Sequence, residues 1–152
     1  MVRVTKLTQE FLPAFLDMIE KHEGIEKKNE IKKSYKSLRA EEEYLVCIDV
    51  ERNAPIGYSK TTALTHGILK LDDIYVIPEL RRDTNGSIIL VAVYNRAINQ
   101  MMAGIIAECE ESNEVGTAFL KARGFVLGKT EGGVHFFTKS LIHMYIPHKH
   151  ED

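Results

Sequence analysis

The stretch IYVIPELRRDTNGSIIL, residues 74–90, carries the most structural information in this chain. Its first four residues are β-branched or aromatic and are typical of a strand, which Pro78 ends. A polar loop with two adjacent arginines follows, and Gly86 then opens an apolar helix. A strand, a loop and a helix start in this order present backbone N–H groups at the positive end of the helix dipole. The stretch therefore predicts a site for a phosphate group.

Strands and helices are expected to alternate on both sides of this stretch. Phe11, Phe15 and Ile19 recur at helical spacing after Thr8, a plausible N-cap, and residues 26–43, 86–102 and 114–123 also have helical patterns. The expected strands cover residues 2–7, 45–50, 56–64, 68–77, 104–109, 125–129 and 134–141. The order β-α-α-β-β-β-α-β-α-β-β predicts an α/β fold (α+β, with a mixed sheet) that carries helices on both faces.

The composition favours one globular domain. With 152 residues, 44% of them hydrophobic, we expect a single domain over residues 1–152, with a core over about 2–141 and a polar tail over 142–152. A net charge of −2 argues against a nucleic-acid partner. The sequence contains no apolar run of roughly 18 residues, the length of a membrane span, so no membrane partner is expected. Cys47 and Cys109 lie in apolar runs, which predicts reduced, buried thiols and a cytoplasmic location. The spacing of His143, His148 and His150 is too loose to predict a metal site.

Three short motifs occur in order along the chain. The first is VIPELR at residues 76–81, the second is RRDTNG at 81–86, and the third is Asn113 followed by the pair Gly124 and Phe125. Together they resemble the strand-end signature, the phosphate loop and the Asn-containing helix of the GNAT family of acyl-CoA-dependent N-acetyltransferases. The resemblance extends over about residues 2–141 and implies the GNAT acyl-CoA N-acyltransferase fold.

The resemblance implies that acetyl-CoA is the cosubstrate and that the opening stretch binds it. The pyrophosphate would contact the backbone N–H groups of residues 82–87, and the pantetheine arm would pair with the strand edge at 74–76. Arg81 would order the loop or supply positive charge, and Asn113 would hydrogen-bond the pantetheine, cap its helix, or do both. The residues expected to contact acetyl-CoA are Ile74, Tyr75, Val76, Arg81, Arg82, Asp83, Thr84, Asn85, Gly86, Ser87 and Asn113.

The implied reaction is acetyl transfer to a primary amine of a small molecule or a peptide. The amine must lose a proton before it attacks, and the Val76 N–H could polarise the thioester carbonyl. Resemblance to polyamine-acetylating members places Asp72 at an acidic position proposed as the base. Because neighbouring strand residues face opposite ways, only one of Asp72 and Asp73 is expected to point into the site. Glu108 and Glu110 share a strand face and are second candidates for proton transfer or for binding a cationic acceptor. The alternative for Asp72 and Asp73 is that both only contact solvent at the start of their strand.

Three positions depart from the family pattern. Thr84 stands where the family loop has its first glycine, and a β-branched residue with a positive φ is costly. Asp83 places a negative charge near the pyrophosphate, and Leu120 replaces the tyrosine that would protonate the departing thiolate. These departures support a second hypothesis, a GNAT-fold CoA-binding or protein-interaction module with weak or no catalytic activity. Edge strands near the C-terminus also make a homodimer plausible.

Overall fold

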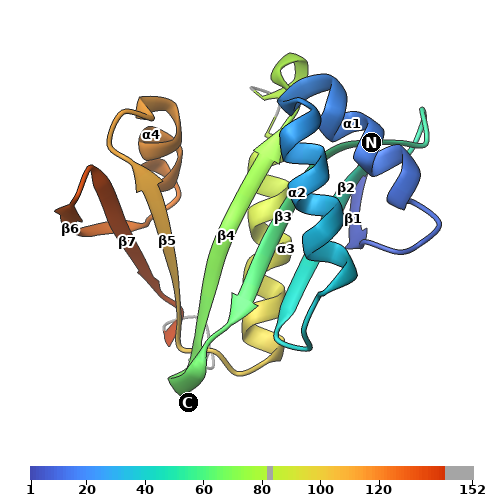
Figure 1. Ribbon diagram of the computed structural model, residues 1–152. Coiled ribbons are helices and arrows are strands. Elements are labelled where there is room, and N and C mark those ends of the chain that lie inside the picture. Colours follow the sequence, from blue (N-terminus) through green and yellow to red (C-terminus); the bar gives the residue numbers. More distant parts are fainter. Residues whose placement is uncertain (82–83, 143–152) are drawn as a thin grey trace. The chain divides into compact units, whose positions relative to one another are not determined.

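The computed structural model describes residues 1–81 and 84–142, and its elements follow one another in the predicted order (Figure 1). The strands are β1 (Val2–Lys6), β2 (Glu42–Asp49), β3 (Ala54–Ala63), β4 (Ile68–Val76), β5 (Gly104–Glu110), β6 (Val126–Glu131) and β7 (Val134–Ser140). The helices are α1 (Leu12–Glu23), α2 (Ile25–Lys36), α3 (Asn85–Asn99) and α4 (Glu114–Ala122), with short 3-10 turns at Thr65–Gly67 and Pro78–Leu80. Hydrogen-bonded strands follow the order β1-β2-β3-β4-β5-β7-β6. β4 and β5 are parallel while β5 and β7 are antiparallel, so the predicted mixed sheet is confirmed.

The chain forms two compact units, which are described separately. The first contains residues 1–61 and 73–92, and the second contains residues 62–72 and the chain from residue 93. β4 and α3 therefore contribute residues to both units. A single domain over residues 1–152 stays a prediction, and the tail histidines lie outside the described residues. In the described ranges, 1–81 and 84–142, every helix is too short or too polar to cross a membrane.

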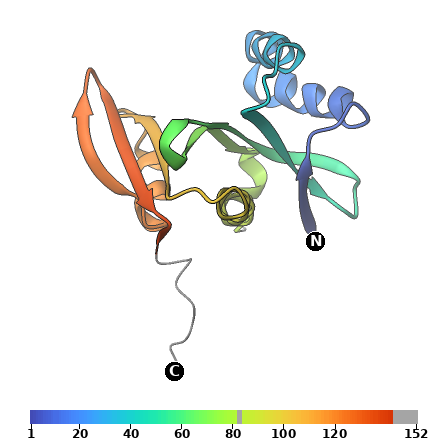
Figure 2. The same cartoon turned by 90° about the horizontal axis from the view of Figure 1, so that it is seen from below.

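The first unit has helices on both faces of its strands (Figure 2). On one face α1 packs against β3, where the rings of Phe15 and Tyr58 lie 5.3 Å apart. Gly57, the preceding residue of β3, faces the other way, and a Cβ added there would lie 3.1 Å from Cδ1 of Ile89 on α3. The buried core of this unit contains Leu7, Phe15, Leu16, Met18, Ile19, Ile31, Tyr44, Val46, Cys47, Ile48, Ile56, Tyr58, Val76, Ile77 and Ile89.

The first two helices each differ from the prediction at one end. α2 ends at Lys36, before the acidic run that was predicted to belong to it. The chain turns there, because the Glu42 N–H donates to the Arg39 carbonyl at 3.0 Å and Glu42 already begins β2. Thr8 does not cap α1, whose N-cap is Phe11 with no side-chain hydrogen bond. The end of α2 is therefore set by the turn into β2, which the helical periodicity of the sequence does not reveal.

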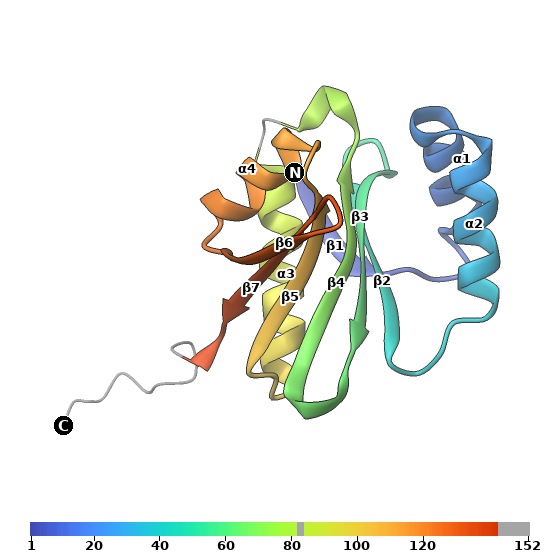
Figure 3. The same cartoon turned by 60° about the vertical axis from the view of Figure 1, so that its left-hand side comes forward.

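The second unit is built around β5, β7 and β6, with α4 in contact with β5 (Figure 3). Residues 68–71 of β4 pair in parallel with residues 104–107 of β5. The Tyr94 hydroxyl on α3 donates to the Arg123 carbonyl at 3.3 Å, and the Lys139 ammonium lies 5.5 Å from the centroid of the Tyr94 ring. Two of the predicted acidic residues follow directly after these paired segments: Asp72 comes after residue 71 of β4, and Glu108 comes after residue 107 of β5.

Candidate active site

The end of β4 presents backbone groups along one edge. The Ile77 N–H donates to the carbonyl of Ile56 on β3 at 2.9 Å. Since successive residues of a strand point their N–H and C=O groups to opposite edges, those of Ile74 and Val76 lie on the edge away from β3. The Val76 carbonyl on that edge accepts a hydrogen bond from Nε of Arg81 at 2.8 Å. The edge predicted to pair with pantetheine is therefore formed by the backbone of Ile74 and Val76.

Arg81 orders this strand end. Its guanidinium lies 5.0 Å from the centroid of the Tyr75 ring, a cation–π contact. Burial raises the pKa of the Tyr75 hydroxyl, and the Arg81 charge opposes that rise. The Tyr75 carbonyl faces β3, where a Cβ on Gly57 would lie only 2.5 Å from it. These contacts tie Arg81 to the end of β4, while its predicted roles in ordering the loop or supplying charge stay predictions. Any contact of Tyr75 with acetyl-CoA is left to its side chain.

The residue before α3 has an unusual backbone conformation. Thr84 has a φ of 67°, in the left-handed region that favours glycine. Its carbonyl accepts the Ile88 N–H at 3.0 Å and so closes the first turn of α3. Nδ2 of the buried Asn85 donates to the Leu80 carbonyl at 3.1 Å, which ties the helix start to the turn after β4. The chain thus adopts a glycine-type conformation at the position where the sequence led us to expect glycine.

The start of α3 suits an anionic ligand. The first N–H groups of a helix have no acceptor within the helix and lie at the positive end of its dipole. In α3 the first of these groups belong to Asn85 and Gly86, so this helix start fits the pyrophosphate of CoA. Arg82 and Asp83, also predicted to contact it, lie outside the described residues. A surface hollow of about 220 Å³ beside this helix start is lined by Thr84, Ser87, Ile88 and Val91.

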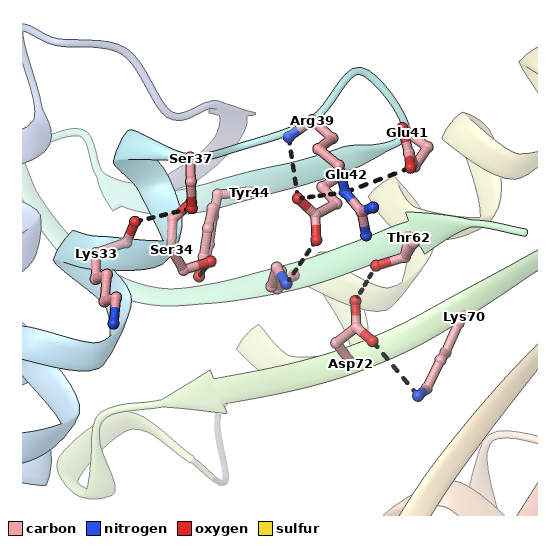
Figure 4. A network of polar contacts seen from close by, with 11 residues as sticks. Lys33, Ser34, Ser37, Arg39, Glu41, Glu42, Tyr44, Thr62, Lys70 and Asp72 are labelled. Atoms are coloured by element: carbon pink, nitrogen blue, oxygen red, sulfur yellow. Dashed lines mark hydrogen bonds and ion pairs between the residues drawn. The ribbon is translucent and has the colours of Figure 1, made fainter.

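The two predicted catalytic acids, Asp72 and Glu108, share one cation in the second unit. The Lys70 ammonium lies 3.9 Å from Oδ1 of Asp72 and 3.6 Å from Oε2 of Glu108. The Thr62 hydroxyl donates to Oδ2 of Asp72 at 2.5 Å (Figure 4). Glu110 is exposed on the same side of β5 as Glu108, as predicted. The structure brings these acids together, and their roles in proton transfer stay predictions.

Asp73 belongs to a different group, in the first unit. Its Oδ2 accepts a hydrogen bond from the Tyr58 hydroxyl at 2.8 Å and lies 3.0 Å from the Lys27 ammonium. The same Tyr58 hydroxyl lies 3.2 Å from Oε2 of Glu23. Two carboxylates, a phenol and an ammonium, contributed by α1, α2, β3 and β4, therefore meet at one place. We call these four residues the Tyr58 cluster.

Burial governs protonation in the Tyr58 cluster. It raises the pKa of Glu23, the charge of Asp73 raises it further, and Lys27, Tyr58 and Arg81 oppose the rise. Burial also raises the pKa of Tyr58 strongly, as do both carboxylates, so the hydroxyl keeps its proton. Burial alone would lower the pKa of Lys27, but the nearby carboxylates, Asp73 first, outweigh it and raise that pKa. The cluster therefore contains an ammonium and a phenol that keep their protons and one carboxyl, Glu23, whose pKa is raised.

Three other predicted positions lie in the second unit. Oδ1 of Asn113 accepts the Gly116 N–H at 2.9 Å, which confirms the predicted cap of α4, while its contact with pantetheine stays a prediction. Leu120 is 5% exposed and belongs to the core, so no proton donor stands there. Cys109 is buried, as predicted, with its Sγ 3.6 Å from the Thr117 hydroxyl. Within residues 1–81 and 84–142, no three His, Cys, Asp or Glu side chains are placed to hold a metal ion.

Sequence reasoning missed most of the Tyr58 cluster. A signal was present, because Tyr58 is the one aromatic residue in the strand APIGYSKTTA, and a buried tyrosine hydroxyl needs a partner. The partners themselves could not be read from the sequence, since Glu23 and Asp73 lie 35 and 15 residues away along the chain. Only the tertiary structure shows which carboxylates reach the hydroxyl.

Comparisons with known proteins agree with the geometry. The model of the acetyltransferase (GNAT) family matches residues 4–125, which is most of the chain. No curated protein matches the chain. The chain is similar to the crystal structure of the PaiA N-acetyltransferase from Thermoplasma acidophilum in complex with coenzyme A, with 19% identity, a TM-score of 0.75, and coverage of 92% of this chain and 99% of that one.

Two further solved structures share the fold. The ribosomal-protein-S18-alanine N-acetyltransferase from Escherichia coli has a TM-score of 0.74 and 14% identity, over 92% of this chain and 94% of its own. An acetyltransferase of the GNAT family from Staphylococcus aureus has a TM-score of 0.75 and 14% identity, over 93% and 99%. These likenesses confirm the predicted fold over nearly the whole chain.

Proposed function

Because the chain belongs to the acetyltransferase (GNAT) family, we propose that it transfers the acetyl group of acetyl-CoA to a primary amine that arrives as an ammonium ion. The family gives the reaction, acyl-CoA-dependent N-acetylation with acetyl-CoA as the cosubstrate, and an amine as the acceptor. The proposed parts are the residues that hold the cosubstrate and the chemical class of the amine. One observation supports this acceptor most directly: the Tyr58 hydroxyl connects Glu23 of α1 to Asp73 of β4, the strand whose edge would pair with pantetheine.

Acetyl-CoA would be held by two features of the first unit. The backbone of Ile74 and Val76 would pair with the peptide-like pantetheine arm, and the N–H groups at the start of α3 would bind the pyrophosphate. Bound there, acetyl-CoA supplies an activated thioester. The Val76 N–H lies on the pairing edge and would stabilise the oxyanion that forms when the amine attacks. Arg81 fixes that strand end through the Val76 carbonyl and the Tyr75 ring.

The amine must be neutral when it attacks. Alkyl ammonium ions have a pKa near that of lysine, about 10.4, so a base has to remove a proton at neutral pH. We propose that a carboxylate of β4 receives it. The sequence pointed to Asp72, with Glu108 as the second candidate, and the structure adds Asp73 with its Tyr58 and Glu23 partners. The leaving thiolate would be protonated by water, because Leu120 has no proton to donate.

The charge of the candidate residues favours a cationic small molecule over an uncharged one. Both groups of carboxylates already hold an ammonium of the chain itself, Lys27 at Asp73 and Lys70 between Asp72 and Glu108. Sites that bind a lysine ammonium at 3.0 Å also suit the ammonium of an external amine. An amine of a peptide or protein has the same chemistry, and the similar E. coli enzyme is named for an alanine of ribosomal protein S18.

The experiment starts with binding and continues to turnover. Coenzyme A and acetyl-CoA should raise the melting temperature, since a ligand that binds only the folded state stabilises it. Thiol release from acetyl-CoA is then measured with primary amines, a tertiary amine of similar size, and a peptide. We expect release with primary amines and none with the tertiary amine. No thermal shift at millimolar CoA would rule out cosubstrate binding and the proposal with it.

A second function is favoured by two observations. Thr84 has the strained φ of 67° at the phosphate loop, and Leu120 leaves the position of the usual acid without a donor. A CoA-binding or protein-interaction module with weak or no catalysis would explain both. A clear thermal shift with CoA but no thiol release with any amine would identify this function.

Two further expectations remain part of the proposal. A homodimer is supported by β6, whose residues are all exposed and include the apolar Val126 and Leu127. A cytoplasmic location is supported by the two free, buried thiols, Cys47 and Cys109. Size-exclusion chromatography with light scattering tests the first, and localisation of the tagged chain tests the second.

A further inference from the structure

The Tyr58 hydroxyl lies between two carboxylates but has only one hydrogen to donate. The tyrosine is fully buried, so water does not supply the missing partner from bulk solvent. Its oxygen is 2.8 Å from Oδ2 of Asp73 and 3.2 Å from Oε2 of Glu23. If both carboxylates were ionised, one of them would face the tyrosine lone pairs without a hydrogen between them. The arrangement is satisfied when one extra proton is shared by the three groups.

The two distances indicate where that proton rests. The shorter contact suits Tyr58 as the donor to ionised Asp73, which also faces the Lys27 ammonium at 3.0 Å. Glu23 then carries the extra proton and donates it to the Tyr58 oxygen. Burial raises the pKa of Glu23 and Asp73 adds to that effect, in agreement with this placement.

Other charged groups that face the cluster do not move the extra proton away from Glu23. Lys27 reaches the cluster from α2, and Glu30, on the same helix, lies 3.9 Å from the Lys27 ammonium. Arg81, from the end of the turn after β4, and Lys27 both oppose the rise in the pKa of Glu23, yet that pKa remains raised. Both Tyr58 and Lys27 contact Oδ2 of Asp73, so Oδ1 is the atom we assign to an incoming ammonium.

We propose that the Tyr58 cluster is a proton relay: once Glu23 has released its resting proton to solvent, Tyr58 passes the proton of the acceptor ammonium from Asp73 to Glu23. The inference rests on the proposed function and assigns its proton path. An N–H bond of the ammonium breaks and an O–H bond forms on Asp73. Asp73 then gives its proton to the Tyr58 oxygen while the Tyr58 hydroxyl proton moves to Glu23. The products are a neutral amine, ionised Asp73 and protonated Glu23, and no electrons are transferred between residues.

In this relay Asp73 is the catalytic residue, and Tyr58 and Glu23 act through it. Glu23 is partly exposed, so it can release its resting proton to solvent before each turnover and can then accept the proton that Tyr58 passes on. Removal of the Tyr58 hydroxyl should therefore interrupt proton transfer without disturbing the start of α3 or the edge formed by Ile74 and Val76. This separates the relay from a purely structural tyrosine.

The test compares Tyr58→Phe with Tyr44→Phe in the full chain. Tyr44 is a matched control: it is buried in the same aromatic cluster, 6.4 Å from the Tyr58 ring, but its hydroxyl bonds Ser34. We measure thiol release with a primary amine across pH, together with the KM for acetyl-CoA. Tyr58→Phe should lower kcat by about 10²-fold or more and move the acidic limb of kcat/KM, with the KM for acetyl-CoA unchanged. Tyr44→Phe should keep the wild-type kcat and pH profile.

Glu23→Gln provides the second variant, because it keeps the shape but cannot store the proton. It should show the same loss of kcat as Tyr58→Phe, and the double variant should be no worse than either single one. If the wild type is active and Tyr58→Phe keeps the same kcat and pH profile, the relay is overturned and the proposed function stands. Turnover lost in Asp72→Asn but kept in Asp73→Asn also overturns it.

A measurement without turnover separates the relay from the proposed function. The carboxyl carbons of the glutamates are followed by ¹³C NMR as the pH is raised in the free protein. The relay requires the Glu23 carboxyl, identified by its loss in Glu23→Gln, to ionise at higher pH than the exposed glutamates. Ionisation of Glu23 together with the exposed glutamates overturns the relay, whether or not the protein acetylates any amine.

Discussion

Replacement of Thr84 by glycine tests how the phosphate loop is built. With a φ of 67°, Thr84 occupies a conformation that disfavours residues with a Cβ by roughly 1–2 kcal/mol. Glycine removes that strain, but its unfolded state has more freedom, which offsets about 0.5–1 kcal/mol. The net expectation is a gain of about 0.5–1 kcal/mol in the free energy of unfolding, or roughly 2–3 °C in melting temperature for a chain of this size.

The control for this prediction is Thr84→Ala. Alanine removes the hydroxyl and any contact it makes, as glycine does, but it keeps the Cβ that the positive φ penalises. The comparison of glycine with alanine therefore isolates the backbone. Urea unfolding at equal protein concentration measures the difference, with Thr84→Gly expected to be the more stable of the two.

The same variant should bind CoA more tightly. Without a side chain at residue 84, the backbone at the start of α3 can approach the pyrophosphate more closely, and about 1 kcal/mol would lower the Kd roughly fivefold. Isothermal titration of CoA into both variants measures this. A glycine variant that is no more stable than the alanine variant would refute the strain argument, and an unchanged or higher Kd would refute the placement of the pyrophosphate.

Three other predictions concern single residues away from the loop. Gly57→Ala should destabilise the fold by roughly 1–3 kcal/mol in urea unfolding, because its Cβ would lie 2.5 Å from the Tyr75 carbonyl. Gly128→Ala is the control and should have little effect, because the nearest atom to its Cβ is 3.4 Å away. Glu23→Gln should stabilise the protein at pH 8, since the raised pKa of Glu23 means that folding disfavours its ionised form; this advantage should disappear as the pH falls below about 4.3, where the carboxyl is protonated in both states. Equal stability of the two proteins at pH 8 would contradict that reasoning. The Cys47 thiol, whose pKa burial raises to about 11, should react with a thiol reagent at pH 7.5 only after unfolding, and rapid labelling of the native protein would show that it is accessible.

The order of the elements could be predicted because its signals are local. Pro78 ends a β-branched run, Gly86 lies in the first turn of an apolar helix, and these two residues mark the ends of β4 and the start of α3 within a few residues. Family resemblance placed Thr84 at a glycine position, and its φ of 67° lies in the region that favours glycine. By contrast, α2 ends before Glu42, whose carboxylate accepts the Arg39 N–H at 3.0 Å in the turn and pairs with Lys60 on β3 at 3.4 Å. A helical pattern in the sequence does not reveal those contacts.

The candidate site could be predicted only in part for a related physical reason. The backbone features, the β4 edge and the helix start, follow from local sequence. The side-chain groups depend on contacts between residues far apart in the chain, as in the pairing of Glu23 with Tyr58. Asp72 was predicted from the family resemblance, but the cation that it shares with Glu108, Lys70, was not anticipated. The loop at Arg82 and Asp83 lies outside the described residues, so their predicted contacts remain predictions.

The most direct test of the central claim is product analysis with labelled cosubstrate. The purified chain is incubated with acetyl-CoA carrying a ¹³C-labelled acetyl group and a mixture of primary amines, and the products are identified by mass spectrometry and NMR. The account predicts labelled acetyl groups on primary amine nitrogen, with free CoA released in equal amount and no product without protein. Binding of CoA without any labelled amide, under conditions where the folded protein is verified, would contradict it.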